Sequence, residues 1–455
     1  MQTDRKSKRR SVKRMLLYLA AFFIPPALVS IVVFYNIVSG WMTVRYPSKL
    51  PVEFPEPPDY DPSKQVALVL VSNNGTESTD LLAPYEILAS SGVLNVYTIA
   101  PKREISPIWH GVDIVPHFSF EEFEKKIDVA PALILIPNIA DPQDSTVIRW
   151  VQRNAGDDMW MVSVCEGARV LAESGLLHNR KASSHFWALD QFEKDYPTTE
   201  WTRGVRFVED GNIITSAGVT ASIDATLQAL RRVAGLEVAR ETARKLNYPM
   251  ELHPRNVDAF DFKTTDFISL FTTAGCLWNK TETAVLLFEG ISEIELGSIL
   301  DLYPRVFDGT AGTVAPARKP IRSKNGLDLV PWWSFEEAPG LDQLVFFDNA
   351  FSESNAPFSE WAKTRGISVN RFNSEKGNSE KSLFAYDIIV SDIASRRSNA
   401  VARAVAKTVE YPVKHLELSG ASWPVKLLLF PLALGLFSVT LVWWIKKKLA
   451  KQTKT

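Results

Sequence analysis

Cysteine and histidine are scarce in this chain of 455 residues, which has two cysteines and six histidines. Cys165 and Cys276 stand at no motif spacing, so the sequence excludes a disulfide scaffold and a zinc framework, while a single Cys165–Cys276 disulfide stays open. The histidines form no HxxxH pair, and no glycine-rich phosphate loop is present. We therefore expect neither a metal nor a cofactor.

Net charge is also small, at −1, but the charges are unevenly placed. Residues 1–14 contain seven Lys or Arg and one Asp, and residues 446–455 contain five Lys. The part of the chain between these basic tails is therefore acidic. An acidic body gives no support for nucleic-acid binding, so we expect no nucleic-acid partner.

Two long apolar runs adjoin the basic tails. Residues 15–38 and 427–445 carry no charged side chain and are long enough to cross a bilayer. The alternatives are a cleaved signal peptide for the first run and a buried core helix for the second. Because Lys and Arg mark the cytoplasmic side, we expect a two-pass protein of the bacterial cytoplasmic membrane. Both termini would be cytoplasmic and the main body extracytoplasmic, with the lipid bilayer as one partner.

The sequence divides into eight segments by composition. In order, they are a basic tail (1–14), a membrane helix (15–38), a spacer (39–64), an α/β domain (65–250), a connector (251–280), a second α/β domain (281–415), a membrane helix (427–445) and a basic tail (446–455). Six prolines between residues 46 and 64 predict a stiff, extended spacer.

Apolar runs alternate with helical patterns in the first α/β domain. QVALVL (65–70) and ALILI (132–136) predict buried strands, and TDLLAPYEIL (79–88) predicts a helix. Continuously apolar strands between helices indicate a parallel sheet that is covered on both faces.

The second α/β domain repeats the first. GVDIVPHFSFEE (111–122) matches GLDLVPWWSFEE (326–337), and further matches keep the same offset of 215 residues. The fold class is therefore α/β, with two tandem flavodoxin-like or glutamine-amidotransferase-like lobes between two membrane helices. The second lobe is shorter and lacks the stretch that would correspond to the surroundings of Cys165.

The stretch MVSVCEGARVLAESGLL (161–177) places Cys165 at a corner between a buried strand and a helix. Such a corner, at the carboxyl end of a parallel strand, exposes a nucleophile and offers backbone N–H groups to an oxyanion. The following helix should lower the thiol pKa, and Gly167 should let the chain approach a ligand closely. The alternative is that Cys165 is a small buried apolar residue.

Several motifs between residues 66 and 249 together resemble the ThiJ/PfpI superfamily, which is related to class I glutamine amidotransferases. They are TDLLAPYEIL, SVCEGARVLAESGLLHNRKASSH and NIITSAGVTASIDATLQAL, the last in the form seen in isonitrile-hydratase-like proteins and in the sensor half of AraC-type regulators. The resemblance implies this fold. It also implies a reactive cysteine whose substrate these motifs do not specify.

The resemblance also implies roles for individual residues. Cys165 matches the reactive thiol, Asp80 the acidic residue that contacts it, and His185 a histidine that some members place near the pocket. The backbone amides of Glu166 and Gly167 would form part of an oxyanion site. Two alternatives stay open: Asp80 as an N-cap of the first helix, and His185 as a structural residue packed among aromatic rings.

Two departures from the family patterns narrow the function. The peptidase-like branch has histidine directly after the cysteine, where this chain has Glu166, so a protease is not favoured. No helix-turn-helix domain follows, as it would in an AraC-type regulator. We expect either cysteine-dependent hydration or hydrolysis of a small carbon–nitrogen or carbonyl compound, or a non-catalytic sensor of a small molecule or oxidant. A homo-oligomer is compatible with both functions.

Overall fold

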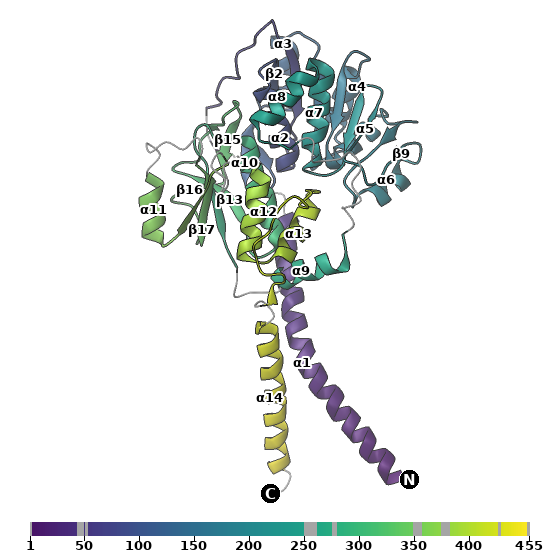
Figure 1. Ribbon diagram of the computed structural model, residues 1–455, viewed down its shortest axis with the longest axis vertical. Helices are drawn as coiled ribbons and strands as arrows, with labels where there is room; N and C mark the ends of the chain where they lie inside the picture. Colours follow the sequence, from purple (N-terminus) through teal and green to yellow (C-terminus); the bar gives the residue numbers. More distant parts are fainter. Residues whose placement is uncertain are drawn as a thin grey trace.

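The computed structural model describes residues 2–42, 50, 53–249, 262–274, 280–348, 357–374, 383–425 and 429–452. These residues form two α/β lobes with a long apolar helix near each end of the chain (Figure 1). We call residues 65–249 the first lobe and residues 283–411 the second lobe. The predicted fold class, α/β with parallel sheets, is confirmed.

A seven-stranded sheet forms the centre of the first lobe, and only its edge pair β10–β11 is antiparallel. In pairing order the strands are β10 (Phe207–Asp210), β11 (Ile213–Ser216), β7 (Trp160–Ser163), β6 (Leu133–Ile136), β1 (Gln65–Leu70), β2 (Leu94–Ala100) and β5 (Phe118–Ser119). A separate short pair joins β8 (Lys181–Ala182) to β9 (Glu200–Trp201).

Helices cover both faces of this sheet, which explains why its central strands are apolar throughout. One face packs against α2 (Ser78–Ser90), α7 (Ala221–Ala234) and α8 (Leu236–Lys245). The other packs against α3 (Phe120–Lys126), α4 (Ser145–Asn154), α5 (Ala168–Glu173) and α6 (Leu189–Asp195). Successive residues of β1 alternate between the two faces, with Val69 in the first core and Leu68 in the second.

The second lobe contains a five-stranded parallel sheet with the order β16-β13-β12-β17-β18. Its strands are β16 (Trp333–Ser334), β13 (Ala311–Ala315), β12 (Thr283–Leu286), β17 (Gln343–Phe347) and β18 (Ser368–Phe372). Its helices are α10 (Glu293–Leu302), α11 (Pro357–Arg365), α12 (Ala385–Arg396) and α13 (Asn399–Thr408), with α9 (Thr264–Ala274) packed on α13. The order matches β5-β2-β1-β6-β7 of the first lobe.

The two lobes join through an antiparallel sheet and a pair of helices. The sheet has the order β14-β15-β4-β3, formed by β14 (Ile321–Arg322), β15 (Asp328–Pro331), β4 (Val112–Val115) and β3 (Ser106–Ile108). Ile114 pairs with Leu329, and these two residues hold the same position in the repeated segments. The flanking pairs are Asp113–Val330 and Val115–Asp328. The lobes are therefore related by an approximate two-fold axis, beside which α2 packs against α10.

The terminal helices α1 (Gln2–Met42) and α14 (Leu429–Gln452) extend from the same end of the body and pack against each other (Figure 1). Their apolar stretches, Ser11–Val32 and Leu429–Leu449, have mean hydropathies of 2.2 and 1.7. The share of buried residues in these stretches is 0% and 6%, whereas a core helix would be mostly buried. By length and composition, both stretches could cross a membrane.

Candidate thiol site between the lobes

Cys165 lies at the sharp corner that the sequence predicts. It follows β7 and begins a single 3₁₀ turn, Cys165–Gly167, that leads into α5. Its φ is +57°, in the left-handed region that non-glycine residues seldom adopt. Its backbone N–H donates to the carbonyl oxygen of Ala217 at 3.1 Å. Such a strained corner between strand and helix is the geometry of a nucleophile elbow.

Asp80 lies in the first turn of α2 and is fully buried. It is not the N-cap: Glu77 is, and its carboxylate accepts the Asp80 N–H at 2.7 Å. The Asp80 carboxylate instead accepts the N–H of Asn138 at 3.2 Å. Asn138 follows β6, which is the neighbour of β7. This contact holds Asp80 at the same sheet edge as Cys165.

The thiol and the carboxyl group both favour their protonated forms. Burial raises the pKa of Asp80 to about 8. Cys165 is only 5% exposed, and this burial is the largest cause that raises the pKa of its thiol well above the usual value. The negative charges of Asp80 and Glu166 raise it further. The expectation of a lowered thiol pKa is therefore wrong. Desolvation and nearby carboxylates outweigh the helix N-terminus.

The two backbone N–H groups predicted as oxyanion donors, those of Glu166 and Gly167, have different partners in the structure. The Glu166 N–H is directed at the Cys165 sulfur, and the Glu166 carboxylate lies 3.7 Å from Arg169. The Gly167 N–H donates to the Val164 carbonyl at 2.8 Å, so its prediction as an oxyanion donor is wrong. A Cβ at Gly167 would lie 2.3 Å from the Ile136 carbonyl oxygen. Glycine is needed here for close backbone packing, and the predicted close approach to a ligand is not what requires it.

His185 packs as a structural residue and faces the second lobe. Its ring stacks on Phe186 with centroids 4.6 Å apart, and Nε2 lies 3.3 Å from the Thr408 carbonyl. A Cβ at Gly218 would lie 1.9 Å from the His185 ring. Burial lowers the pKa of His185 to about 4. These contacts favour the structural alternative over a role in proton transfer.

The second lobe adds charged side chains beside Asp80. Arg305 lies 3.2 Å from Asp301 and 3.5 Å from Glu77, and the His110 ring lies 3.2 Å from Asp301. Burial alone would raise the pKa of Asp301, but the His110 hydrogen bond and the charge of Arg305 hold it well below its usual range. Burial and the charge of Asp301 raise the pKa of Glu77 well above normal.

Three of these groups have the spacing of metal ligands. The nearest donor atoms of Glu77, His110 and Asp301 lie within 4.8 Å of one another. Arg305 contacts both carboxylates, however, and a guanidinium cannot share that position with a metal ion. The group is better described as a buried ion-pair network that joins the two lobes.

A second contact from the other lobe covers the corner itself. Glu410, just beyond α13, accepts the N–H of Gly218 at 2.6 Å and that of Phe186 at 3.2 Å. Gly218 directly follows Ala217, the acceptor of the Cys165 N–H. Burial raises the pKa of Glu410 to about 8, against the effect of these N–H donors. The second lobe therefore lies over the thiol site.

Sequence reasoning missed four of these groups: Glu77, Asp301, Arg305 and Glu410. Glu77 gave no usable signal, because glutamate is not among the residues preferred at an N-cap. Asp301 and Arg305 stand four residues apart and pair with each other. Only the packing of the lobes brings them to the site. Cys165 is a free thiol, and Cys276, its one candidate disulfide partner, is not among the described residues.

The chain is similar to known proteins over part of its length. The sequence model described as the DJ-1/PfpI family matches residues 64–232. The isonitrile hydratase of Pseudomonas putida is 28% identical over 183 residues, which are 38% of this chain and 74% of that protein. The HTH-type transcriptional regulator CdhR of Pseudomonas aeruginosa is 34% identical over 99 residues, 22% of this chain and 29% of the regulator.

Solved structures match less than half of the chain. A THiJ/PfpI family protein from Pseudomonas syringae is 23% identical, with a TM-score of 0.37, and the match covers 47% of this chain and 87% of that one. The predicted resemblance is confirmed for part of the chain, since residues 64–232 match the DJ-1/PfpI family model.

Proposed function

We propose that the thiol site hydrates or hydrolyses a small molecule with a carbon–nitrogen multiple bond or a carbonyl group. Cys165 is the nucleophile and Asp80 the proton donor and acceptor. The observation that carries this proposal is a strained corner that holds a buried thiol together with a carboxyl group whose pKa is about 8. Similarity to an isonitrile hydratase supports the same class of substrate.

The chemistry can be written for an isonitrile. The sulfur adds to the terminal carbon, which takes a proton from Asp80, while the S–H proton restores the carboxyl group. Water then adds to the resulting thioimidate carbon. The C–S bond breaks, the thiol regains its proton, and an N-substituted formamide leaves. Because Asp80 keeps its proton near neutral pH, it can act as the acid in the first step.

Burial limits what the site can accept. Cys165 is 5% exposed and lies beneath contacts from the second lobe, so a protein substrate does not fit this arrangement. The same burial favours a second candidate, a module that binds a small molecule without turnover. A thiol whose pKa is raised is a poor oxidant sensor, which makes a ligand sensor the better form of that alternative.

We also propose that α1 and α14 anchor the body to the bacterial cytoplasmic membrane, with both termini cytoplasmic. The apolar stretches and the adjoining Lys and Arg residues support this orientation. We further propose that the body arose by tandem duplication, which the common strand order and the symmetric β4–β15 pairing support.

Turnover by the purified full chain tests the catalytic proposal. Small isonitriles and carbonyl compounds are incubated with the wild type, Cys165→Ala and Asp80→Asn, and products are measured by mass spectrometry. Asp144→Asn, at the half-buried N-cap of α4, is the matched control. We expect Cys165→Ala to lose about 10³-fold or more of the rate, as for other nucleophiles. Full turnover in Cys165→Ala would refute the proposal, and tight binding without turnover would favour the sensor.

A further inference from the structure

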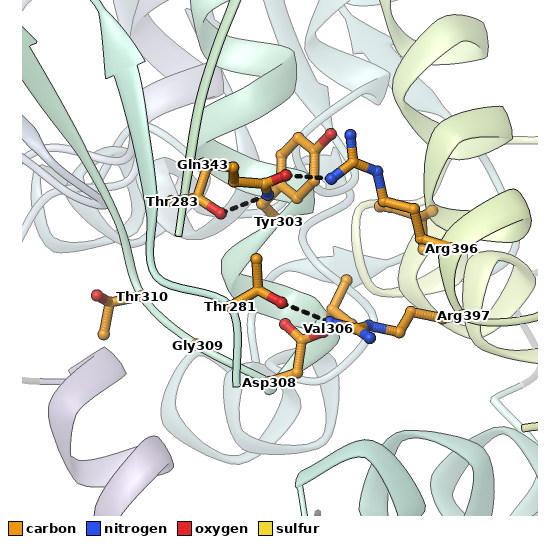
Figure 2. Close-up of a pocket in the computed structure, with 11 residues that line it drawn as sticks. Thr281, Thr283, Tyr303, Val306, Asp308, Gly309, Thr310, Gln343, Arg396 and Arg397 are labelled. Atoms are coloured by element: carbon orange, nitrogen blue, oxygen red, sulfur yellow. Dashed lines mark hydrogen bonds and ion pairs between the residues drawn. The ribbon is translucent and has the colours of Figure 1, made fainter. Parts of the chain in front are cut away.

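A cavity of about 290 Å³ lies in the second lobe, far along the chain from the thiol corner (Figure 2). Thr283 and Gln343 line it and are the first residues of β12 and β17. The cavity therefore opens at the amino ends of the second sheet. Cys165 follows the carboxyl end of a strand in the first sheet, so the two sites are distinct.

The cavity wall contains polar residues on two strands, β12 and β17, whose counterparts in the first lobe, β1 and β6, are apolar. Thr283 and Gln343 are 2% and 3% exposed, and the Gln343 amide donates to the Thr283 hydroxyl at 2.7 Å. The matching central strands of the first sheet are apolar from Val66 onward in β1 and throughout β6. Buried polar side chains cost stability unless they are bonded. Core packing alone does not account for them at these positions.

Two guanidinium groups at the end of α12 form the opposite wall. Arg396 is held by the Asp392 carboxylate at 2.7 Å and donates to the side-chain amide oxygen Oε1 of Gln343. Arg397 is held by Asp308 and by the Thr281 hydroxyl at 2.7 Å (Figure 2). Anchored guanidinium groups lose little further entropy when they bind an oxyanion.

Charge decides which kind of ligand fits this wall. The charged lining residues are Arg396, Arg397 and Asp308, so the surface that a ligand meets has more positive than negative charge. Asp392, which is not among the lining residues, pairs with Arg396 and also accepts the Tyr303 hydroxyl at 2.5 Å, which fixes its position. Threonine hydroxyls supply neutral hydrogen bonds to the remainder of a ligand.

We propose that this cavity binds a small molecule through a carboxylate or phosphate group, which Arg396 and Arg397 hold. Guanidinium groups match these oxyanions with charge-assisted hydrogen bonds, and Gln343 positions Arg396 for the contact. The volume is at the low end of the range for ligand pockets, which restricts the ligand to metabolite size. This site does not depend on the chemistry proposed for Cys165.

Calorimetric titration of the detergent-solubilised full chain tests the proposal. The probes are succinate, inorganic phosphate and glycerol 3-phosphate, with ethanolamine as a cationic control and lipid nanodiscs with an anionic phospholipid as a separate arm. We expect at least one oxyanion probe to bind and ethanolamine not to bind. Soluble probes and nanodiscs distinguish a free metabolite from a lipid headgroup as the source of the oxyanion.

Three variants make the result specific. Arg396→Gln should weaken binding about 10-fold or more, and Gln343→Leu, which gives β17 the apolar character of β6, should weaken it several-fold with both arginines kept. Arg153→Gln, an exposed arginine of the first lobe, should bind as the wild type does. Circular dichroism shows whether each variant is folded, and Gln343→Leu carries the test if Arg396→Gln unfolds. Absence of binding by every oxyanion probe, or unchanged binding in both cavity variants, would overturn the proposal.

Discussion

Glu410 offers the most quantitative prediction, because it is a single buried carboxyl group at the contact between the lobes. Its pKa rises from 4.5 to about 8, chiefly through burial. Between these values the folded protein holds a proton that the unfolded chain has released. The contribution of Glu410 to stability is therefore greatest below about pH 4.5, falls as the pH rises towards 8, and stays at the lower level above it.

The size of this effect follows from the shift. At 1.36 kcal/mol for each pKa unit, the change from 4.5 to about 8 corresponds to about 5 kcal/mol as an upper limit. Glu410→Gln removes the titration but keeps one acceptor for Gly218 or Phe186. Leaving the other N–H unpaired adds a cost of about 1–3 kcal/mol that does not depend on pH.

Thermal unfolding of the solubilised full chain, followed from about pH 5 to pH 8.5, measures the difference between the two proteins. Other buried acids, such as Asp80 and Glu293, titrate in both proteins and cancel in this difference. Glu410→Gln should gain stability relative to the wild type as the pH rises. Parallel loss of stability in both proteins would show that Glu410 is already ionised in the folded state, and the reasoning from burial would fail.

Three further predictions follow from membrane topology and close packing. Protease added to intact spheroplasts should digest the body and spare tags on both termini, and cleavage of the tags with a protected body would show the reverse orientation. Gly167→Ala should destabilise the protein by about 1–3 kcal/mol in urea unfolding, because its Cβ would meet the Ile136 carbonyl at 2.3 Å; unchanged stability would contradict the close contact. Gly218→Ala should also destabilise it, and His185→Ala in the same chain should restore part of the loss; additive effects of the two changes would contradict their contact.

Much of the fold could be predicted because its signals are local. Apolar runs such as QVALVL and LILI form β1 and β6, and the repeated sequences of 111–122 and 326–337 contain the equivalent strands β4 and β15. The corner at Cys165 was predictable for the same reason, since a strand, a small turn and a helix are adjacent in sequence. The Gly167 assignment failed because a glycine satisfies tight backbone packing and ligand approach equally well.

The electrostatics of the site could not be predicted in this way. The thiol pKa depends on burial beneath the second lobe and on Asp80, which is 85 positions away in sequence. Arg305 and Glu410 reach the site because the strands β4 and β15 pair and α2 packs against α10, which brings the lobes together. Local sequence therefore fixes the backbone of the corner, whereas its charge balance depends on tertiary contacts.

The central claim is that Cys165 and Asp80 act as a coupled pair, and the rate of Cys165 alkylation against pH tests it most directly. Mass spectrometry of the modified peptide, in the wild type and Asp80→Asn with Asp144→Asn as control, reports this one thiol. Removing a negative charge that raises the thiol pKa should lower that pKa and speed alkylation at mildly alkaline pH. Identical pH profiles for the wild type and Asp80→Asn would show that the two groups are not coupled, and would contradict the account.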